Sequence, residues 1–485
     1  MSASAAVTAP SAAAAPARLV RPALSFVALA LAGGAAWTAT ASWSTDQRVV
    51  VCVFAVATVA WAASRLDDTL VALGAALALV IAGVLPSADL FAALGDSTIW
   101  LLIGSCMLAA GIGASGLVER VSAALVSRAR TVRGLAHLTT VALTLTVFAM
   151  PATSGRAALA LPLFRTLGAA LPTRGLQVGF SLLFPAVILL SAFASILGAG
   201  AHLIAAELVR VSTGTEISFL LWLALGAPLA VLTCHIAAEV VLCAFLSRED
   251  RAAAVGSVAE RIAAAPDHPR GRLRPAEWRA GVTLVAVVAL WLTEPLHGLH
   301  PAVVALIGAI VSISPGTGTT APRQALGAVP WSLLLFLAAT LAIGTAFVDS
   351  GAAASLADAA FAPLAGGHPA TALLAIVVAS AFAHLVVQSR SARSSVLVPI
   401  VLAVAPAVGL DPAAAALAST AAAGFCLTLT SSAKPVAMFA DVGGVATFDR
   451  RTLGAFSAVL APYAIAAVVL AALFWWPVLG VPLMS

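Results

Sequence analysis

Long apolar runs, separated by charged or by proline- and glycine-rich stretches, dominate this chain. A helix needs about 20 mostly apolar residues to cross a bilayer. The runs predict about 11 such crossings and two re-entrant hairpins of shorter helices, and the period-two alternation of a membrane β-barrel is not visible. The predicted crossings are 23–42, 49–64, 69–86, 97–117, 175–212, 217–246, 280–297, 300–316, 330–350, 413–446 and 452–480, and the hairpin arms are 134–150, 157–171, 372–388 and 396–408.

The composition supports an all-α polytopic membrane protein. Of the 485 residues, 62% are hydrophobic and only 9% are charged, whereas about 25% are charged in a typical soluble domain. The formal charge of +5 comes mainly from arginines in predicted cytoplasmic loops, so it does not indicate a nucleic-acid partner. All five cysteines lie in apolar runs without CxxC spacing, which indicates neither a zinc site nor a disulfide framework.

The distribution of lysine and arginine predicts the orientation. These residues accumulate in cytoplasmic loops of membrane proteins. Most of the 25 in this chain fall on one side of the bilayer when the N-terminus is cytoplasmic. We therefore expect a multi-pass protein of the plasma membrane with its N-terminus in the cytoplasm and its C-terminus outside.

A short string occurs twice in apolar sequence. Arg156 and Pro162 recur as Arg393 and Pro399, since 393 − 156 = 237 and 399 − 162 = 237. Basic residues flank the first hairpin but not the second, which predicts opposite polarity and thus an inverted repeat. The alternative is two ordinary helical hairpins that share the string by chance.

Four polar breaks at membrane depth supply a predicted anion site. Non-helical backbone is tolerated there only where it is buried in protein or lines a cavity. The breaks carry cations, hydroxyl groups and helix N-termini but no Asp or Glu, a set that suits an anion. The predicted substrate-binding residues are Thr153, Ser154, Gly155, Arg156, Gly200, His202, Ser389, Arg390, Ser391, Arg393, Ser431, Ser432 and Lys434.

Each cation has a structural alternative. Arg156 and Arg393 would then bond helix-end carbonyls, Arg390 and Lys434 would extend to lipid headgroups, and His202 would be a packed side chain. His384 lies in an apolar arm, where a packed role is the more common one.

The pattern divides the chain into six parts. A disordered tail (1–22) precedes scaffold helices (23–133) and a transport unit (134–246). A cytoplasmic linker (247–279) leads to a second scaffold (280–365) and a second transport unit (366–485).

Several motifs resemble the divalent anion:sodium symporter family, also called solute carrier family thirteen. The segments 96–105 and 115–120 resemble the first helix region of its first repeat, and 291–298 and 331–336 resemble the start of its second repeat. The resemblance covers about residues 23–480 and implies an elevator-type carrier that forms a homodimer.

The functional signature of that family is substituted here. Its hairpin tips carry Ser-Asn-Thr, and the matching positions read Ala152-Thr153-Ser154 and Ser389-Arg390-Ser391. In its two breaks, His202 and Lys434 stand where the family has asparagine. The resemblance implies sodium sites at these places, so the hypothesis is that Arg156, Arg390, Arg393 and Lys434 replace the sodium ions.

We therefore expect a secondary transporter of a small anion such as a dicarboxylate, sulfate or sulfonate, working by sodium-independent exchange or with a proton carried by His202. The alternatives are a sodium-coupled symporter of the same family, a cation or metalloid antiporter of the same superfamily, and an anion channel. Neither a catalytic dyad nor a metal-ligand cluster is visible, so we expect no enzyme, no metal and no cofactor. The expected partners are the substrate, the bilayer and a second copy of the chain.

Overall fold

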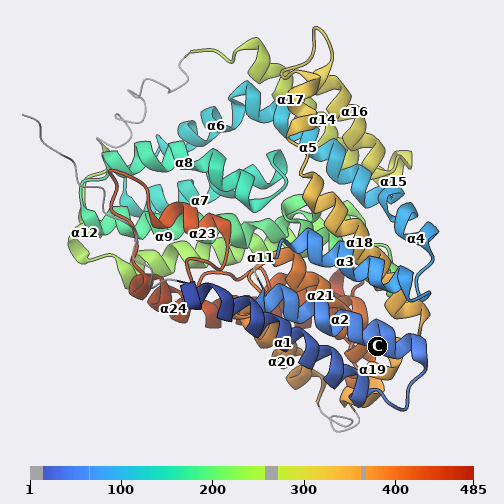
Figure 1. Cartoon of the computed structure of the whole chain (residues 1–485). Helices are drawn as coiled ribbons and strands as arrows, with labels where there is room; N and C mark the ends of the chain where they lie inside the picture. Colours follow the sequence, from blue (N-terminus) through green and yellow to red (C-terminus); the bar gives the residue numbers. More distant parts are fainter. Residues whose placement is uncertain (1–14, 65, 257–270, 362–367, 485) are drawn as a thin grey trace, which may run out of the picture.

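The named secondary-structure elements of the described residues are all helices. The computed structural model describes residues 15–64, 66–256, 271–361 and 368–484 (Figure 1). Within these ranges, 8 helices are long and apolar enough to cross a membrane, and five shorter apolar helices accompany them. The predicted all-α polytopic fold is therefore confirmed, while the number of 11 crossings stays a prediction.

Among the described residues, nine helices of the first half have a counterpart in the second half, in the same order. The pairs are α2 (Thr45–Ala63) with α14 (Pro275–Leu292), α3 (Asp68–Ile81) with α16 (Pro301–Ile313), α5 (Ser97–Ser115) with α18 (Trp331–Asp349), α6 (Leu117–Val126) with α19 (Ala352–Phe361), α7 (Val132–Ala149) with α20 (Pro369–Phe382), α8 (Thr153–Ala170) with α21 (Arg390–Val404), α9 (Arg174–Leu190) with α22 (Pro412–Ala422), α10 (Gly200–Thr213) with α23 (Lys434–Ala440), and α11 (Phe219–Val240) with α24 (Arg450–Leu470). The remaining α-helices are α1 (Ala15–Ala39), α4 (Ser87–Ala92), α12 (Arg248–Ala252), α15 (Glu294–His297) and α17 (Pro322–Gly327).

Irregular features recur with the helices. Pro162 inside α8 corresponds to Pro399 inside α21, and α11 and α24 each contain a proline. Both α11 and α24 run directly into a π-helical turn, η5 (Val241–Phe245) and η8 (Ala471–Trp475). Since proline removes a helical donor and π turns are rare, their recurrence supports the internal duplication.

The helix after each break packs against the opposite half. The first half contributes α10, which lies against α21 and α22, and the second half contributes α23, which lies against α8 and α9. Figure 1 shows α23 beside α8 and α9. Two hydrogen bonds extend this contact, from Ala446 N to Gln177 Oε1 and from Phe448 N to Ser181 Oγ, each 3.0 Å long. The breaks of both halves are thereby held inside one interlocked unit.

Side-chain caps fix where several helices begin. Asp96 accepts from Thr98 N at the start of α5, and Thr173 accepts from Leu176 N at the start of α9. In the second half, Ser389 and Asp411 cap α21 and α22 in the same way. Such caps satisfy amide groups that have no partner within the helix.

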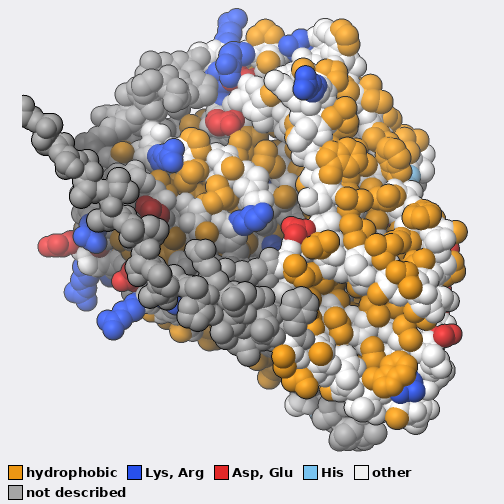
Figure 2. Space-filling view, viewed as in Figure 1, with side chains coloured by type: hydrophobic (Ala, Val, Ile, Leu, Met, Phe, Trp, Pro, Cys, Tyr) orange, Lys and Arg blue, Asp and Glu red, His pale blue; other side chains and the backbone are white. Residues whose placement is uncertain are grey.

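The outer surface is apolar over much of one side. Figure 2 shows hydrophobic side chains covering the region of α3, α4, α16 and α18, while most of the visible Lys and Arg side chains lie outside this region. A broad apolar surface rimmed by charge suits contact with lipid chains.

Some predicted boundaries differ from the observed ones. Helix α1 begins at Ala15, inside the predicted tail, because alanine favours helix; residues 1–14 lie outside the described part. The predicted linker 247–279 contains α12 and the first turn of α14. Its residues 257–270 and the predicted boundary at 366 also lie outside the described ranges.

Candidate anion site

The first hairpin tip joins α7 to α8 through a strained residue. Ala152 precedes α8 with φ at 94°, a backbone conformation that residues with a Cβ atom rarely adopt. Thr153, Ser154 and Gly155 follow as the half-buried first turn of α8. Strained backbone persists where the surroundings hold it and is concentrated at functional sites.

Arg156 is fully buried and held by oxygen atoms of its own half. Its Nε donates to Thr146 Oγ1 (2.9 Å), its Nη1 to Ile188 O (3.0 Å), and its Nη2 to Leu143 O (2.9 Å) and Ser191 Oγ (2.6 Å). These acceptors lie near the ends of α7 and α9 that face the break. The guanidinium therefore ties the first hairpin to the first break.

Arg393 has the matching place in the second half and is 1% exposed. Its Nη1 donates to Val387 O (3.3 Å), and its Nη2 donates to Ala423 O (2.9 Å) and Cys426 Sγ (2.7 Å). It ties α21 to the end of α22, as Arg156 ties α8 to the end of α9. Its Nε is buried without a hydrogen-bond partner in the described part of the chain.

Arg390, in the second half of the chain, contacts a residue of the first half. Its Nη2 lies 3.2 Å from His202 Nε2. A guanidinium only donates, so His202 Nε2 must be the acceptor and His202 Nδ1–H donates to Ser195 O (3.0 Å). His202 is therefore neutral in this arrangement, because a second ring proton would face the N–H of Arg390.

The other terminal nitrogen of Arg390 is the unusual atom of the site. Nη1 is buried and has no hydrogen-bond partner among the described residues. A buried donor without a partner costs about 1–3 kcal/mol, and more on a charged group. Such a group in a native fold needs an explanation, and a bound ligand or water supplies one.

The first break depends on glycine. It consists of two short 3-10 turns, η3 (Ser191–Ala194) and η4 (Ile196–Gly198), before α10 starts. A Cβ atom on Gly198 would overlap the carbonyl of Ala192, and one on Gly200 would lie 2.8 Å from the Leu333 side chain of α18. Glycine thus lets the break close tightly and lets α10 approach α18.

Hydroxyl groups order the second break, at residues 423–433. Buried Ser432 accepts from Leu429 N at 3.0 Å, and exposed Ser431 is 3.5 Å from Gln388 Nε2 at the second hairpin tip. Thr428 Oγ1 contacts both His384 Nε2 (2.9 Å) and Ser457 Oγ (2.7 Å). This chain of contacts links the second hairpin, the second break and α24.

Lys434 lies apart from the arginines. It is the first residue of α23, and its side chain is exposed. Within the described residues it makes no hydrogen bond or ion pair, whereas Arg156 and Arg393 are buried and Arg390 is half-buried.

We call Arg156, Arg390 and Arg393 the arginine cluster. Arg390 interacts electrostatically with both of the others. None of the ion pairs found among the described residues includes a member of the cluster. Three positive charges without a carboxylate partner create a field that favours an anion, since protein interiors screen charge weakly.

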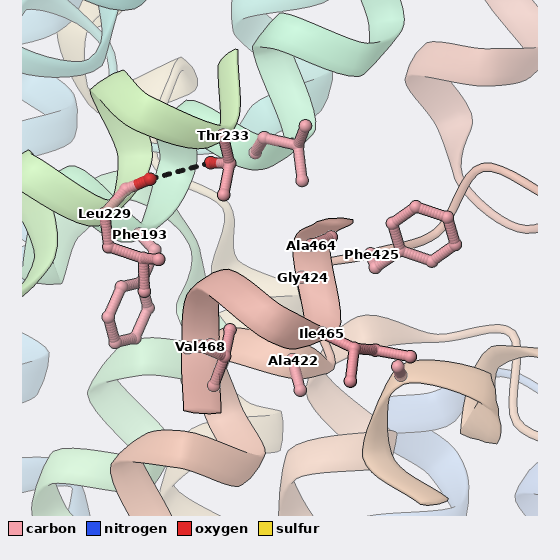
Figure 3. Close-up of a pocket in the computed structure, with 12 residues that line it drawn as sticks. Phe193, Leu229, Thr233, Ala422, Gly424, Phe425, Ala464, Ile465 and Val468 are labelled. Carbon is pink, nitrogen blue, oxygen red and sulfur yellow. Dashed lines mark hydrogen bonds between the residues drawn. The ribbon is translucent and has the colours of Figure 1, made fainter. Parts of the chain in front are cut away.

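An apolar pocket adjoins the cluster (Figure 3). Phe193, Ile465 and Val468 contribute to its lining. The hydroxyl of Thr233, also in the lining, donates a hydrogen bond to the carbonyl of Leu229. The ring of Phe193 packs edge-on against His202, with centroids 5.6 Å apart. On another side, a Cβ on Gly424 would lie 3.0 Å from Arg390 Nη2. The pocket therefore forms a low-dielectric wall beside the cluster.

The predicted residues are only partly brought together. The structure joins Arg390 and His202 across the two halves and places Ser389, Ser431 and Ser432 around the second tip and break. The hydrogen bonds of Arg156 and Arg393 stay within their own halves. The site prediction as a whole stays a prediction.

Two polar clusters have no counterpart in the sequence-based prediction. Arg210 pairs with Glu207 in α10 and lies 3.6 Å from Asp96 Oδ2 at the start of α5. His137 and His235 face each other between α7 and α11. The spacing of these residues along the chain does not predict either cluster. The one exception is the i, i+3 spacing of Glu207 and Arg210, which is typical of an ion pair on a helix.

The fold and site define a polytopic membrane transporter, a carrier rather than an enzyme. A sequence profile of a family described as citrate transporter matches residues 58–422 and, in a second match, 288–483, so the chain belongs to the citrate transporter family. This family is related to the divalent anion:sodium symporters that the motifs resemble; membership of solute carrier family thirteen itself stays a prediction.

Individual relatives agree with this class. An uncharacterised transporter of Mycobacterium tuberculosis is 29% identical over 343 residues, which cover 66% of this chain and 72% of the relative. A membrane protein of Cupriavidus necator is 24% identical over 325 residues, 64% of this chain. That match spans only 62% of the length of the Cupriavidus protein.

A solved structure shows the same kind of fold. The YdaH transporter of Alcanivorax borkumensis superimposes with a TM-score of 0.52 at 18% identity, covering 81% of this chain and 89% of that one. At this identity the similarity concerns the fold alone.

Proposed function

We propose that this carrier exchanges small, multiply charged organic anions without sodium, with citrate as the first candidate and dicarboxylates, sulfate and sulfonates as further ones. The observation that carries the proposal is the buried, unpartnered Nη1 of Arg390 in a cluster of three guanidinium groups without a carboxylate. A di- or trianion would offset most of that charge, and its carboxylate oxygens match the planar fork of arginine.

The acceptor atoms that surround the guanidinium groups of Arg156 and Arg393 support sodium independence. Two carbonyls and two hydroxyls surround the Arg156 guanidinium, and oxygen ligands of this kind also suit a hard cation. A fixed guanidinium fills this space at all times. In this proposal the two arginines stand in permanently for cations that related carriers bind reversibly.

Fixed charge also favours exchange over net uptake. An empty site with three positive charges, two of them buried, crosses the low-dielectric part of the protein at a high electrostatic cost, whereas a loaded site is nearly neutral. By analogy with the related family, the crossing unit would comprise residues 134–246 and 366–485 and move as an elevator in a homodimer. The N-terminus would lie in the cytoplasm and the C-terminus outside.

Exchange in proteoliposomes tests the proposal. Vesicles loaded with citrate, dicarboxylate or sulfate are placed in sodium-free buffer with external radiolabelled citrate. We expect internal citrate to accelerate uptake, and we expect Arg390→Gln to reduce exchange at least about tenfold, the loss for a charged hydrogen bond of about 1.5 kcal/mol or more. Arg165→Gln is the matched control. Arg165 is exposed and lies in α8, the counterpart of the helix α21 that contains Arg390.

Two results would overturn the proposal. Uptake that requires an inward sodium gradient and ignores internal anion would indicate a symporter. Large anion currents that do not depend on an internal substrate would indicate a channel.

A further inference from the structure

Two histidines meet between the first hairpin and α11, away from the arginine cluster. His137 Nδ1 in α7 lies 2.8 Å from His235 Nδ1 in α11, and the ring centroids are 5.0 Å apart. On its other side, His137 Nε2 is 2.7 Å from Glu239 Oε1. Arg133 also pairs with that carboxylate oxygen at 2.7 Å.

The geometry limits the number of protons the pair holds. Glu239 accepts, so His137 Nε2 carries a hydrogen. Two ring nitrogens at 2.8 Å share one hydrogen, which His235 Nδ1 donates to His137 Nδ1 when both rings are neutral. One added proton still fits, because His137 then donates and His235 accepts. With both rings charged, two N–H groups would point at each other, and the contact is lost.

The elements that pack against α7 and α11 determine which charged groups surround the histidine pair. The charged or titratable side chains of the described residues on these elements are Cys106 (α5), Glu119 and Arg120 (α6), Arg156 and Arg165 (α8), Arg174 (α9), Cys243 (η5), Arg248, Glu249, Asp250 and Arg251 (α12), Glu277 and Arg279 (α14), Arg450, Arg451 and Tyr463 (α24), and Arg133, Cys234 and Glu239 on α7 and α11 themselves. Several are occupied elsewhere: Arg120 pairs with Glu277, and Arg251 donates to Leu242 O. Cys243 Sγ is 4.0 Å from Glu239 Oε2. Arg133 and Glu239 therefore set the immediate charge of the pair.

We propose that His137, His235 and Glu239 form a proton-binding site that couples protonation to the position of the first hairpin. With neutral or singly charged rings, the site holds α7 against α11. Protonation of both rings releases α7. An unperturbed imidazole has a pKa of about 6.5, so the tests below compare pH 7.5 with pH 5.5.

The direction of the pH effect follows from proton linkage. The packed state accepts one added proton at most, while the separated state accepts two. The contact therefore contributes stability above the ordinary titration range of histidine and loses it as the pH falls. Acid favours separation of α7 from α11, and separation in turn draws in a proton.

Thermal unfolding of the purified full chain tests the site directly. We expect the midpoint of the wild type to fall by several degrees more between pH 7.5 and 5.5 than that of His235→Gln or His137→Gln. His368→Asn is the matched control, because His368 caps α20 and asparagine retains a capping side chain. It should keep the pH dependence of the wild type.

Transport gives the second readout, and here the inference rests on the proposed anion exchange. We expect the exchange rate of the wild type to change at least about threefold between pH 7.5 and 5.5, and that of the two variants by less than about half as much. Equal pH dependence of unfolding in wild type and both variants would overturn the proton site. Absence of exchange in every protein would overturn the proposed function alone, since unfolding still decides the site.

Discussion

Arg156 and Arg393 have matching positions and matching surroundings at the scale of the single residue. Both are buried, and both donate to carbonyl groups near the end of the helix that precedes the break in their own half. A guanidinium provides five donors in a fixed plane. It can therefore hold three chain segments together where the helical hydrogen bonds stop.

Removing this group should loosen the first hairpin. Arg156→Met leaves the hydroxyls of Thr146 and Ser191 and the carbonyl of Ile188 without their donor, so we expect a loss of about 2–4 kcal/mol in unfolding free energy. Thermal unfolding in detergent measures it. Arg165→Met at an exposed position should stay within about 0.5 kcal/mol. Similar losses in both variants would contradict a specific role for Arg156.

The backbone at Ala152 offers a prediction of the opposite sign. Because its φ is 94°, Ala152→Gly should relieve strain and stabilise the protein by about 1 kcal/mol. Ala158→Gly, at an exposed site within α8, should destabilise it by about as much. A lower unfolding midpoint for Ala152→Gly would show that the alanine is not strained there.

The sequence identifies the buried cations but not what they bind. Arg156 and Arg393 are visible as arginines in apolar runs that repeat at a constant distance. Their acceptors are mostly backbone carbonyls, such as those of Leu143 and Ala423, and any residue type provides a carbonyl. The pairing of His137 with His235 is hidden for another reason, because 98 positions separate them.

At the scale of the element, glycine and hydroxyl residues shape the two breaks. The sequence predicts both, from Gly198 and Gly200 in the first and from Ser431, Ser432 and Pro435 in the second. It does not reveal that α11 passes close against the first break. Trp222 Nε1 donates to Phe193 O (3.0 Å), and a Cβ on Gly226 would overlap that same carbonyl.

A substitution that adds one methyl group at Gly226 tests this close approach. Gly226→Ala forces α11 away from the first break, and we expect loss of anion exchange and a lower yield of folded protein. Gly74→Ala is the control, because a Cβ there meets nothing within 4 Å and alanine favours helix. It should stabilise α3 by up to about 1 kcal/mol. Full activity of Gly226→Ala would mean that the contact is not required.

Asp250 fastens α12 to the start of α9. Burial raises the pKa of this carboxyl, but hydrogen bonds from Thr173 and Ser247 outweigh burial and hold its pKa below the ordinary value. Its contribution is therefore present above the unfolded pKa of about 3.9 and is lost as the pH falls through the lower folded pKa.

We expect Asp250→Asn to lower the unfolding free energy by about 1–2 kcal/mol at pH 7 and by progressively less below pH 4. Glu249→Gln, exposed on the same helix, should change little. The measurement is unfolding as a function of pH, and a difference between wild type and Asp250→Asn that does not shrink in acid would contradict this role.

At the scale of the whole molecule, duplication is the dominant feature. The repeated string already predicts two related halves, and the paired helices agree with it. The exchange of α10 and α23 between the halves is not predictable from the string, because helix packing partners depend on three-dimensional surfaces. This exchange brings His202 of one half to Arg390 of the other.

The proposed anion exchange depends most on Arg390 as an anion ligand, and citrate binding to the purified protein in sodium-free buffer tests this most directly. Calorimetry of the wild type should show binding without sodium, and Arg390→Gln should weaken it at least about tenfold, while Arg165→Gln should not. Equal affinity of wild type and Arg390→Gln, or binding that starts only when sodium is added, would contradict the account.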